Sequence, residues 1–170
     1  MAQRVSGRPR KQLVSKCVTV PGNFELACRD FNAGRFFEAH EWLEEIWQFE
    51  HGPVRDLYKG LIQVAAGFVH ISRSNAAGAR RLLTTAIAYL AAYRPDGAMG
   101  WEVERIASDA EEALRRVVEP GPGRTREFNL ARRPVFAFSH SELGAEARRW
   151  NAWGFDAEGN ALEMEITVAQ

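Results

Sequence analysis

The sequence predicts a mainly α-helical fold, a bundle of about five helices with a small C-terminal β appendage. Over most of residues 24–119, apolar residues recur three and four positions apart, which places them on one face of a helix. Clusters of glycine, proline and asparagine divide this stretch into segments of helical length. Beyond Gly123 the pattern changes to the period of two that is typical of a strand. The alternating residues are Leu162, Met164, Ile166 and Val168.

Turn and capping residues set the limits of the expected helices. Asn23 and Asn75 are suited to cap the first and the fourth helix, and Gly34 follows the end of the first. Pro53 suits the first position of the third helix, which is long and mostly apolar and is therefore expected at the centre. The expected helices cover residues 24–32, 35–49, 53–72, 76–93 and 101–119.

Composition divides the chain into three parts. Residues 1–20 hold five basic residues and no acidic one, so we expect a basic, flexible N-terminal tail. Residues 21–120 form the helical bundle, and residues 121–170 form a C-terminal extension. In this extension RRWNAWGFDAEGNALEMEITV is interpreted as a β-hairpin around DAEGN. We expect the hairpin to pack on the bundle, because an isolated hairpin is marginally stable in water.

The overall composition narrows the class of protein. A length of 170 residues fits one domain, and 46% hydrophobic with 26% charged residues is ordinary for a globular protein. Basic and acidic residues both total 22, so the net charge exerts no general pull toward nucleic acid or anionic lipid. No apolar run is long enough to span a bilayer, and no signal-peptide core is present at the N-terminus. We therefore expect a cytoplasmic protein with no membrane partner.

The segment FFEAHEWLEEIW carries a histidine and a glutamate among aromatic residues. At about 100° per residue, His40 and Glu44 fall on the same side of the expected helix as Phe36 and Trp47. A buried glutamate needs a partner, so this placement predicts a buried polar site. A His–Glu pair one helical turn apart can chelate a divalent metal ion or form a simple hydrogen bond. Cys17 and Cys28 show no metal-type spacing.

A second polar stripe follows the third expected helix and offers partners for this pair. If the second and third helices are antiparallel, Glu44 lies opposite Lys59 and His40 opposite Gln63. Three interpretations stay open: a structural polar network, a metal site, and acid–base chemistry without a metal. In the metal interpretation His40 and Glu44 are the ligands. The candidates to complete the site are Glu41, Gln63 and His70, and the other residues expected to line it are Trp47, Lys59, Arg55 and Phe36.

Three stretches of the chain resemble a known family. FNAGRFFEAHEWLEEIW, RDLYKGLIQVAAGFVH and SNAAGA are similar to the domain of unknown function 309, found in small helical proteins of bacteria and archaea. The resemblance covers roughly residues 28–93. It implies an all-helical fold and an activity that is not established. The family signature H-x-x-x-E-x-x-W, for which metal binding has been suggested, matches His40, Glu44 and Trp47.

Two functional hypotheses follow. The first is a divalent-metal-binding helical protein, for which metal-assisted hydrolysis is the first reaction class to test. The second is a non-enzymatic interaction module that associates with itself, in which His40 and Glu44 form a structural network. Trp42 and Phe49 lie away from the His40 side of the helix, and aromatic residues outside a core are enriched at interfaces. Nucleic-acid binding through the basic tail is a third, weaker hypothesis.

Overall fold

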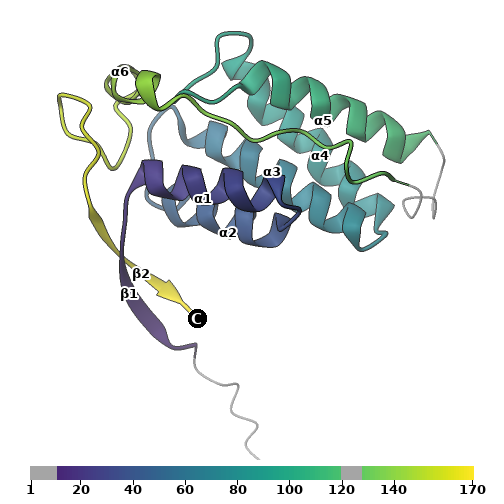
Figure 1. Ribbon diagram of the computed structural model, residues 1–170, viewed down its shortest axis with the longest axis horizontal. Coiled ribbons are helices and arrows are strands. Elements are labelled where there is room, and N and C mark those ends of the chain that lie inside the picture. The colour runs from purple at the N-terminus through teal and green to yellow at the C-terminus, as the bar shows by residue number, and fades with distance from the viewer. Residues whose placement is uncertain (1–10, 120–127) are drawn as a thin grey trace, which may run out of the picture.

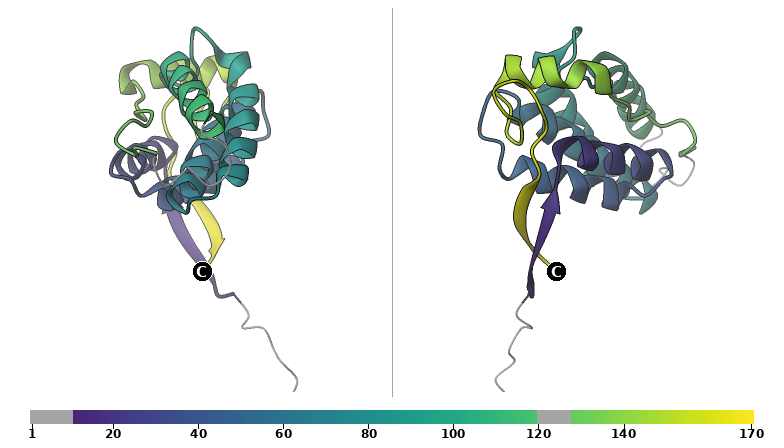
Figure 2. Two further views of the ribbon diagram at one scale, coloured as in Figure 1. Left: turned by 90° about the vertical axis from the view of Figure 1, so that its right-hand side faces the viewer. Right: turned by 60° about the vertical axis from the view of Figure 1, so that its left-hand side comes forward.

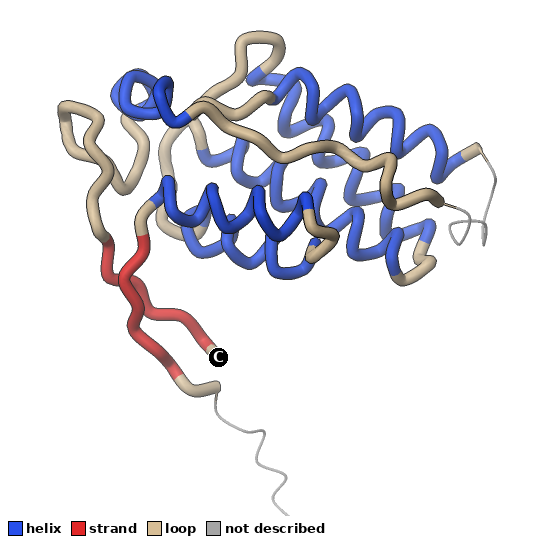
Figure 3. The backbone as a smooth tube through the Cα atoms, viewed as in Figure 1, coloured by secondary structure: helices blue, strands red, loops and turns tan. Residues whose placement is uncertain are grey.

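The structure is a computed structural model that describes residues 11–119 and 128–170. The fold is mainly α-helical with a small two-stranded sheet, as predicted (Figure 1, Figure 3). The helices of the bundle are α1 (Val20–Asn32), α2 (Phe36–Trp47), α3 (Arg55–Ser72), α4 (Ala76–Leu90) and α5 (Val103–Val118). The 3-10 turn η1 (Ala91–Tyr93), helix α6 (His140–Trp150) and the strands β1 (Leu13–Val18) and β2 (Met164–Ala169) complete the described elements.

Helix α3 occupies the centre of the bundle, as its apolar sequence predicts. It packs against α2 on one side and α4 on the other (Figure 1). Glycine brings α3 and α4 close together: a Cβ atom at Gly60 would lie 2.7 Å from Leu90, and one at Gly67 would lie 2.9 Å from Leu83. No helix in the described parts of the chain is long and apolar enough to cross a bilayer.

The start and the cap of α1 differ from the prediction, Pro53 precedes α3, and the cap of α4 agrees with the prediction. Helix α1 begins at Val20 because the Thr19 hydroxyl accepts a 3.0 Å hydrogen bond from the Gly22 amide. Asn23, predicted as the cap, is instead buried inside α1 and donates to the Trp42 carbonyl. Pro53 stands in the turn before α3. Asn75 caps α4 as predicted, accepting from the Gly78 amide at 3.0 Å.

The C-terminal part contains a helix where part of a hairpin was predicted. Residues 148–150, interpreted as the start of a strand, are the last turn of α6. Leu143 and Ala147 lie four positions apart and are buried, so α6 has an apolar side that packs at one end of the bundle (Figure 1). Asn151 adopts the left-handed conformation, with φ 48°, and ends the helix.

The sheet pairs the two ends of the described chain. Strand β2 shows the predicted alternation, with Ile166 buried, but its partner is β1 and not a strand from residues 148–155. The antiparallel register runs from Leu13 opposite Ala169 to Val18 opposite Met164. The expected flexible tail is therefore a strand over residues 13–18, and residues 1–10 lie outside the described residues. Figure 2 shows this ribbon extending away from the helices.

Candidate functional site

The two motif residues His40 and Glu44 form a pair on α2. The His40 Nε2 atom lies 3.2 Å from the Glu44 Oε1 atom. The other ring nitrogen of His40, Nδ1, lies 3.3 Å from the Phe37 carbonyl oxygen. The side chains are 21% and 45% exposed, respectively. The prediction that this pair is buried is wrong, because both side chains stay accessible to solvent.

The direction of the buried side of α2 explains this difference. Four positions of α2 are fully buried, and at 100° per residue their mean direction lies about 80° from His40. His40 and Glu44 therefore lie at the border between the packed side of the helix and solvent. The four buried positions are Phe36, Ala39, Leu43 and Ile46.

Two cationic side chains lie over the ring of Trp47, the third motif residue. The Arg55 guanidinium carbon lies 4.0 Å from the ring centroid and the Lys59 ammonium nitrogen 4.4 Å from it. Both distances are well within the range of attraction between a cation and an aromatic face. Within the described residues neither Arg55 nor Lys59 makes an ion pair, so the expected pairing of Lys59 with Glu44 does not form.

Two buried polar atoms near the motif lack partners. The Trp47 Nε1 donor and the Gln63 Oε1 acceptor have no hydrogen-bond partner among the residues that the structure describes. Phe36, expected to line the site, is buried in the core against Phe31 and Phe68. A buried polar atom without a hydrogen-bond partner lowers the stability of the fold. A group that accepts from Trp47 Nε1 or donates to Gln63 Oε1 would therefore be stabilising.

The candidates to complete a metal site are not gathered around His40. Glu41 is exposed, and the His70 Nδ1 atom lies 2.9 Å from the side-chain amide nitrogen of Asn75, at the junction of α3 and α4. Across residues 11–119 and 128–170, no group of three or more His, Cys, Asp or Glu side chains could hold a metal ion. One chain therefore offers two ligands at this position, His40 and Glu44.

Carboxylates of α2 line an open groove beside the pair. A groove of about 690 Å³ lies between α2 and the β1–β2 ribbon, and Glu38, Glu41 and Glu44 are among the residues along it. Glu45 is neutralised by an ion pair with Lys16 of β1. In the described structure Glu38 and Glu41 make no ion pair, so this side of α2 is acidic, while the cations on Trp47 belong to α3.

Sequence reasoning missed the most buried acidic residues. Asp30 is 2% exposed and accepts hydrogen bonds from Arg29, Arg35 and Trp42. Glu50, also 2% exposed, accepts from the backbone amides of Gly52 and Trp153. The sequence feature that could have indicated the burial of Asp30 is its position on α1, three residues after the buried Ala27. Each oxygen of both carboxylates accepts at least one hydrogen bond, so the two residues join separate parts of the fold.

Comparison with known proteins bears on the part of the chain that carries the motif. Residues 24–82 match a family described as Domain of unknown function (DUF309). The chain is similar to this family over that segment. The predicted resemblance is thus confirmed for a stretch that contains His40, Glu44, Trp47, Arg55 and Lys59.

A curated relative of the DUF309 segment is the "Uncharacterized protein YpuF" of Bacillus subtilis (strain 168). It is 43% identical over 65 residues, which make up 37% of this chain and 37% of the relative. The similarity thus spans little more than a third of either protein. No solved structure matches the chain significantly.

Proposed function

We propose that this protein is a non-enzymatic interaction module that associates with a second copy of itself through one face of α2 and α3. The α2–α3 face consists of Phe37, His40, Glu44, Trp47, Arg55 and Lys59. The observation that carries the proposal is the pair of cations on Trp47, which have no ion-pair partner within the described residues. A second protein surface with carboxylates would supply those partners.

The composition of this face is that of an interface. Tryptophan, phenylalanine and arginine are enriched in protein–protein contacts, and tryptophan and arginine dominate their binding energy. Phe37 is 48% exposed, and its ring centroid lies 5.5 Å from that of His40. An exposed aromatic ring beside a partly exposed polar pair gains from being covered, because apolar area leaves water and nearby ion pairs are strengthened.

Charge complementarity favours a second copy as the partner. The neighbouring outer side of α2 carries Glu38 and Glu41, which make no ion pair within the described residues, while α3 carries Arg55 and Lys59. In an interface with two-fold symmetry, residue i contacts residue j and the reverse contact also forms. In such a dimer the cations of each copy can face the carboxylates of the other, so the same contact forms two times.

Sedimentation equilibrium at micromolar concentration tests self-association. We expect a dimer for the native chain, and a dissociation constant raised at least about tenfold by Arg55→Glu, since losing a charge pair at an interface costs about 2 kcal/mol or more. The matched control is Arg80→Glu, an exposed change on α4 away from the α2–α3 face. Adding Glu41→Arg to Arg55→Glu swaps the charges and should recover part of the affinity.

Two outcomes would contradict self-association. One is a native chain that stays monomeric throughout the concentration range. The other is an equal effect of Arg55→Glu and Arg80→Glu, which would indicate that only net charge matters.

A divalent metal ion at His40 and Glu44 is the second candidate, supported by the orientation of the imidazole. With Nδ1 donating to the Phe37 carbonyl, a neutral ring presents the lone pair of Nε2 toward the Glu44 carboxylate. Metal-binding histidines commonly donate their other ring N–H to a carbonyl in this way. Two ligands are fewer than a structural site needs, and a second copy would bring two more, for a total of about four.

Elemental analysis of protein purified without an affinity tag tests this candidate. We expect about one metal ion per two native chains and a large loss in His40→Ala, because one of the two ligands of each chain is removed. His70→Ala is the control, since His70 contacts Asn75 instead. Equal metal in all three proteins, far below one ion per two chains, would remove the metal candidate and leave the interaction module unaffected.

A further inference from the structure

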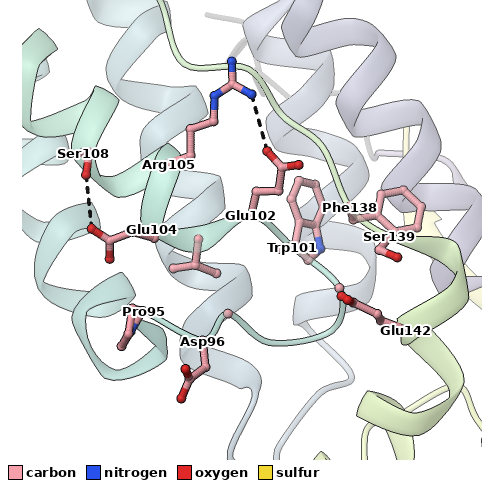
Figure 4. A pocket seen from close by; sticks show the side chains of 13 residues that line it. Pro95, Asp96, Trp101, Glu102, Glu104, Arg105, Ser108, Phe138, Ser139 and Glu142 are labelled. Atoms are coloured by element: carbon pink, nitrogen blue, oxygen red, sulfur yellow. Dashed lines mark hydrogen bonds and ion pairs between the residues drawn. The ribbon is translucent and has the colours of Figure 1, made fainter.

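A second cavity lies far along the chain from the DUF309 motif. It has a volume of about 520 Å³ and is formed by the loop before α5, the first turns of α5, and the chain leading into α6 (Figure 4). This volume is within the range of ligand sites. Its lining contains Arg105, which pairs with Glu102, and six aromatic or acidic side chains. These six are Trp101, Phe138, Asp96, Glu102, Glu104 and Glu142.

Trp101 provides a buried hydrogen-bond donor without an acceptor. The residue is 2% exposed, and its Nε1 atom has no partner among the described residues. Figure 4 shows the indole beside Phe138, with its nitrogen on the side of Ser139 and Glu142. Buried donors are almost always paired, so this N–H needs an acceptor that the described residues do not supply.

Asp96 and Glu142 provide negative charge without a counterion. Both line the cavity and also a neighbouring hollow of about 380 Å³, to which Trp101 also contributes. In the described parts of the chain neither carboxylate makes an ion pair. The other two acids of the lining are neutralised, Glu102 by Arg105 at 3.6 Å and Glu104 by Arg94 at 2.6 Å. The two exposed carboxylates without an ion pair therefore line the same cavity as Trp101.

The backbone holds these groups in a fixed arrangement. Gly100 has φ +75°, and a Cβ atom there would lie 2.5 Å from the Ser139 carbonyl oxygen. The Ser139 amide donates to the Gly100 carbonyl at 2.8 Å, and the Glu102 amide donates to the Ala137 carbonyl at 3.2 Å. These contacts tie the loop that carries Trp101 to the segment that carries Phe138, so the cavity needs little rearrangement to accept a ligand.

We propose that this cavity binds a guanidinium group attached to a carbonyl-bearing backbone, as in an arginine residue. A guanidinium is planar, pairs with carboxylates through two hydrogen bonds, and stacks on aromatic rings, which matches Asp96, Glu142 and the aromatic lining. The carbonyl oxygen accepts from the Trp101 indole. The source is either an exposed segment of another protein or a small arginine derivative, and both share this chemistry.

Nuclear magnetic resonance of the full chain with N-acetyl-L-argininamide tests the proposal. The protein has 5 tryptophans, and comparison with Trp101→Phe assigns the Trp101 indole N–H signal. We expect a saturable downfield shift of that signal, and no shift with N-acetyl-L-citrullinamide, a neutral compound of nearly the same shape. Asp96→Asn and Glu142→Gln should each weaken binding about tenfold, because each removes a charge-assisted hydrogen bond.

Glu158→Gln, an exposed change outside the cavity, is the control and should leave the affinity unchanged. Equal binding of the arginine and citrulline compounds, an unmoved Trp101 signal, or an affinity insensitive to both carboxylate variants would overturn the proposal. A peptide with one central arginine that binds tighter than the amide would indicate a protein segment, and equal affinity would indicate a small molecule. The Arg55→Glu variant should bind the compound normally, so this test is separate from self-association.

Discussion

At the scale of single residues, Asp30 shows how this chain stabilises a buried charge. Its carboxylate lies 2.6 Å from an Arg35 nitrogen, 2.7 Å from the Trp42 indole nitrogen and 3.0 Å from the Arg29 Nε atom. Burial raises the pKa of the Asp30 carboxyl, but the hydrogen bonds from Arg29, Trp42 and Arg35 outweigh burial and lower that pKa to about 2. One side chain of α1 is thus bonded to α2 and to the turn before it.

A lowered pKa in the folded state makes Asp30 a source of acid sensitivity. Since the unfolded carboxyl takes up its proton at higher pH, the stabilisation is complete above about pH 4 and is lost as the pH falls toward 2, a contribution of about 2 kcal/mol. Urea unfolding of Asp30→Asn should show lower stability near neutral pH and a smaller loss over this range. Asp56→Asn, at an exposed position, is the control. Parallel pH profiles for the native chain and Asp30→Asn would contradict this.

The motif residues show what a helical wheel can and cannot predict. Spacing alone correctly placed His40 and Glu44 within reach of each other, and they lie 3.2 Å apart. Spacing did not predict how exposed the two side chains are, because the helices that pack on α2 determine which of its sides is buried. Here α1 and α3 cover the side centred between Ala39 and Leu43, which leaves the pair at the edge.

At the scale of elements, periodicity was sufficient where a helix has a wide apolar side. Helices α1 to α5 all lie close to their expected ranges for this reason. Helix α6 was missed because its sequence, HSELGAEARRW, contains a central glycine and few apolar residues, of which Leu143 and Ala147 are buried. The alternation of β2 was visible, but alternation does not name a partner strand.

The two candidate sites also differ in whether the local spacing of residues could reveal them. The α2–α3 face is formed by two consecutive helices, so the spacing of His40, Glu44 and Trp47 drew attention to it. The Trp101 cavity joins the loop at 95–101 with residues 138–142, which tertiary packing alone brings together. No local pattern predicts that an indole N–H at position 101 lacks an acceptor.

At the scale of the whole molecule, hydrogen bonds between residues far apart in the sequence attach the C-terminal part of the chain to the N-terminal part. Asn32, at the end of α1, exchanges two 2.8 Å hydrogen bonds with the backbone of Phe136. The Glu50 carboxylate accepts from the Trp153 amide at 2.8 Å. Figure 2 shows a further contact of this kind, the pairing of β1 with β2. The C-terminal residues are thus fixed through bonds to the N-terminal third of the chain.

Removing β1 tests this dependence. In a chain that lacks residues 1–17, β2 has no partner, so we expect the amides of Met164–Ala169 to exchange with solvent much faster. The amides of α3 should stay protected, because α2 and α4 still cover that helix. A chain that lacks residues 1–10 is the matched control, since it keeps all of β1. Hydrogen exchange followed by NMR distinguishes the outcomes: unchanged protection of β2 without β1 would mean that the strand pairs within the C-terminal extension, as a hairpin would.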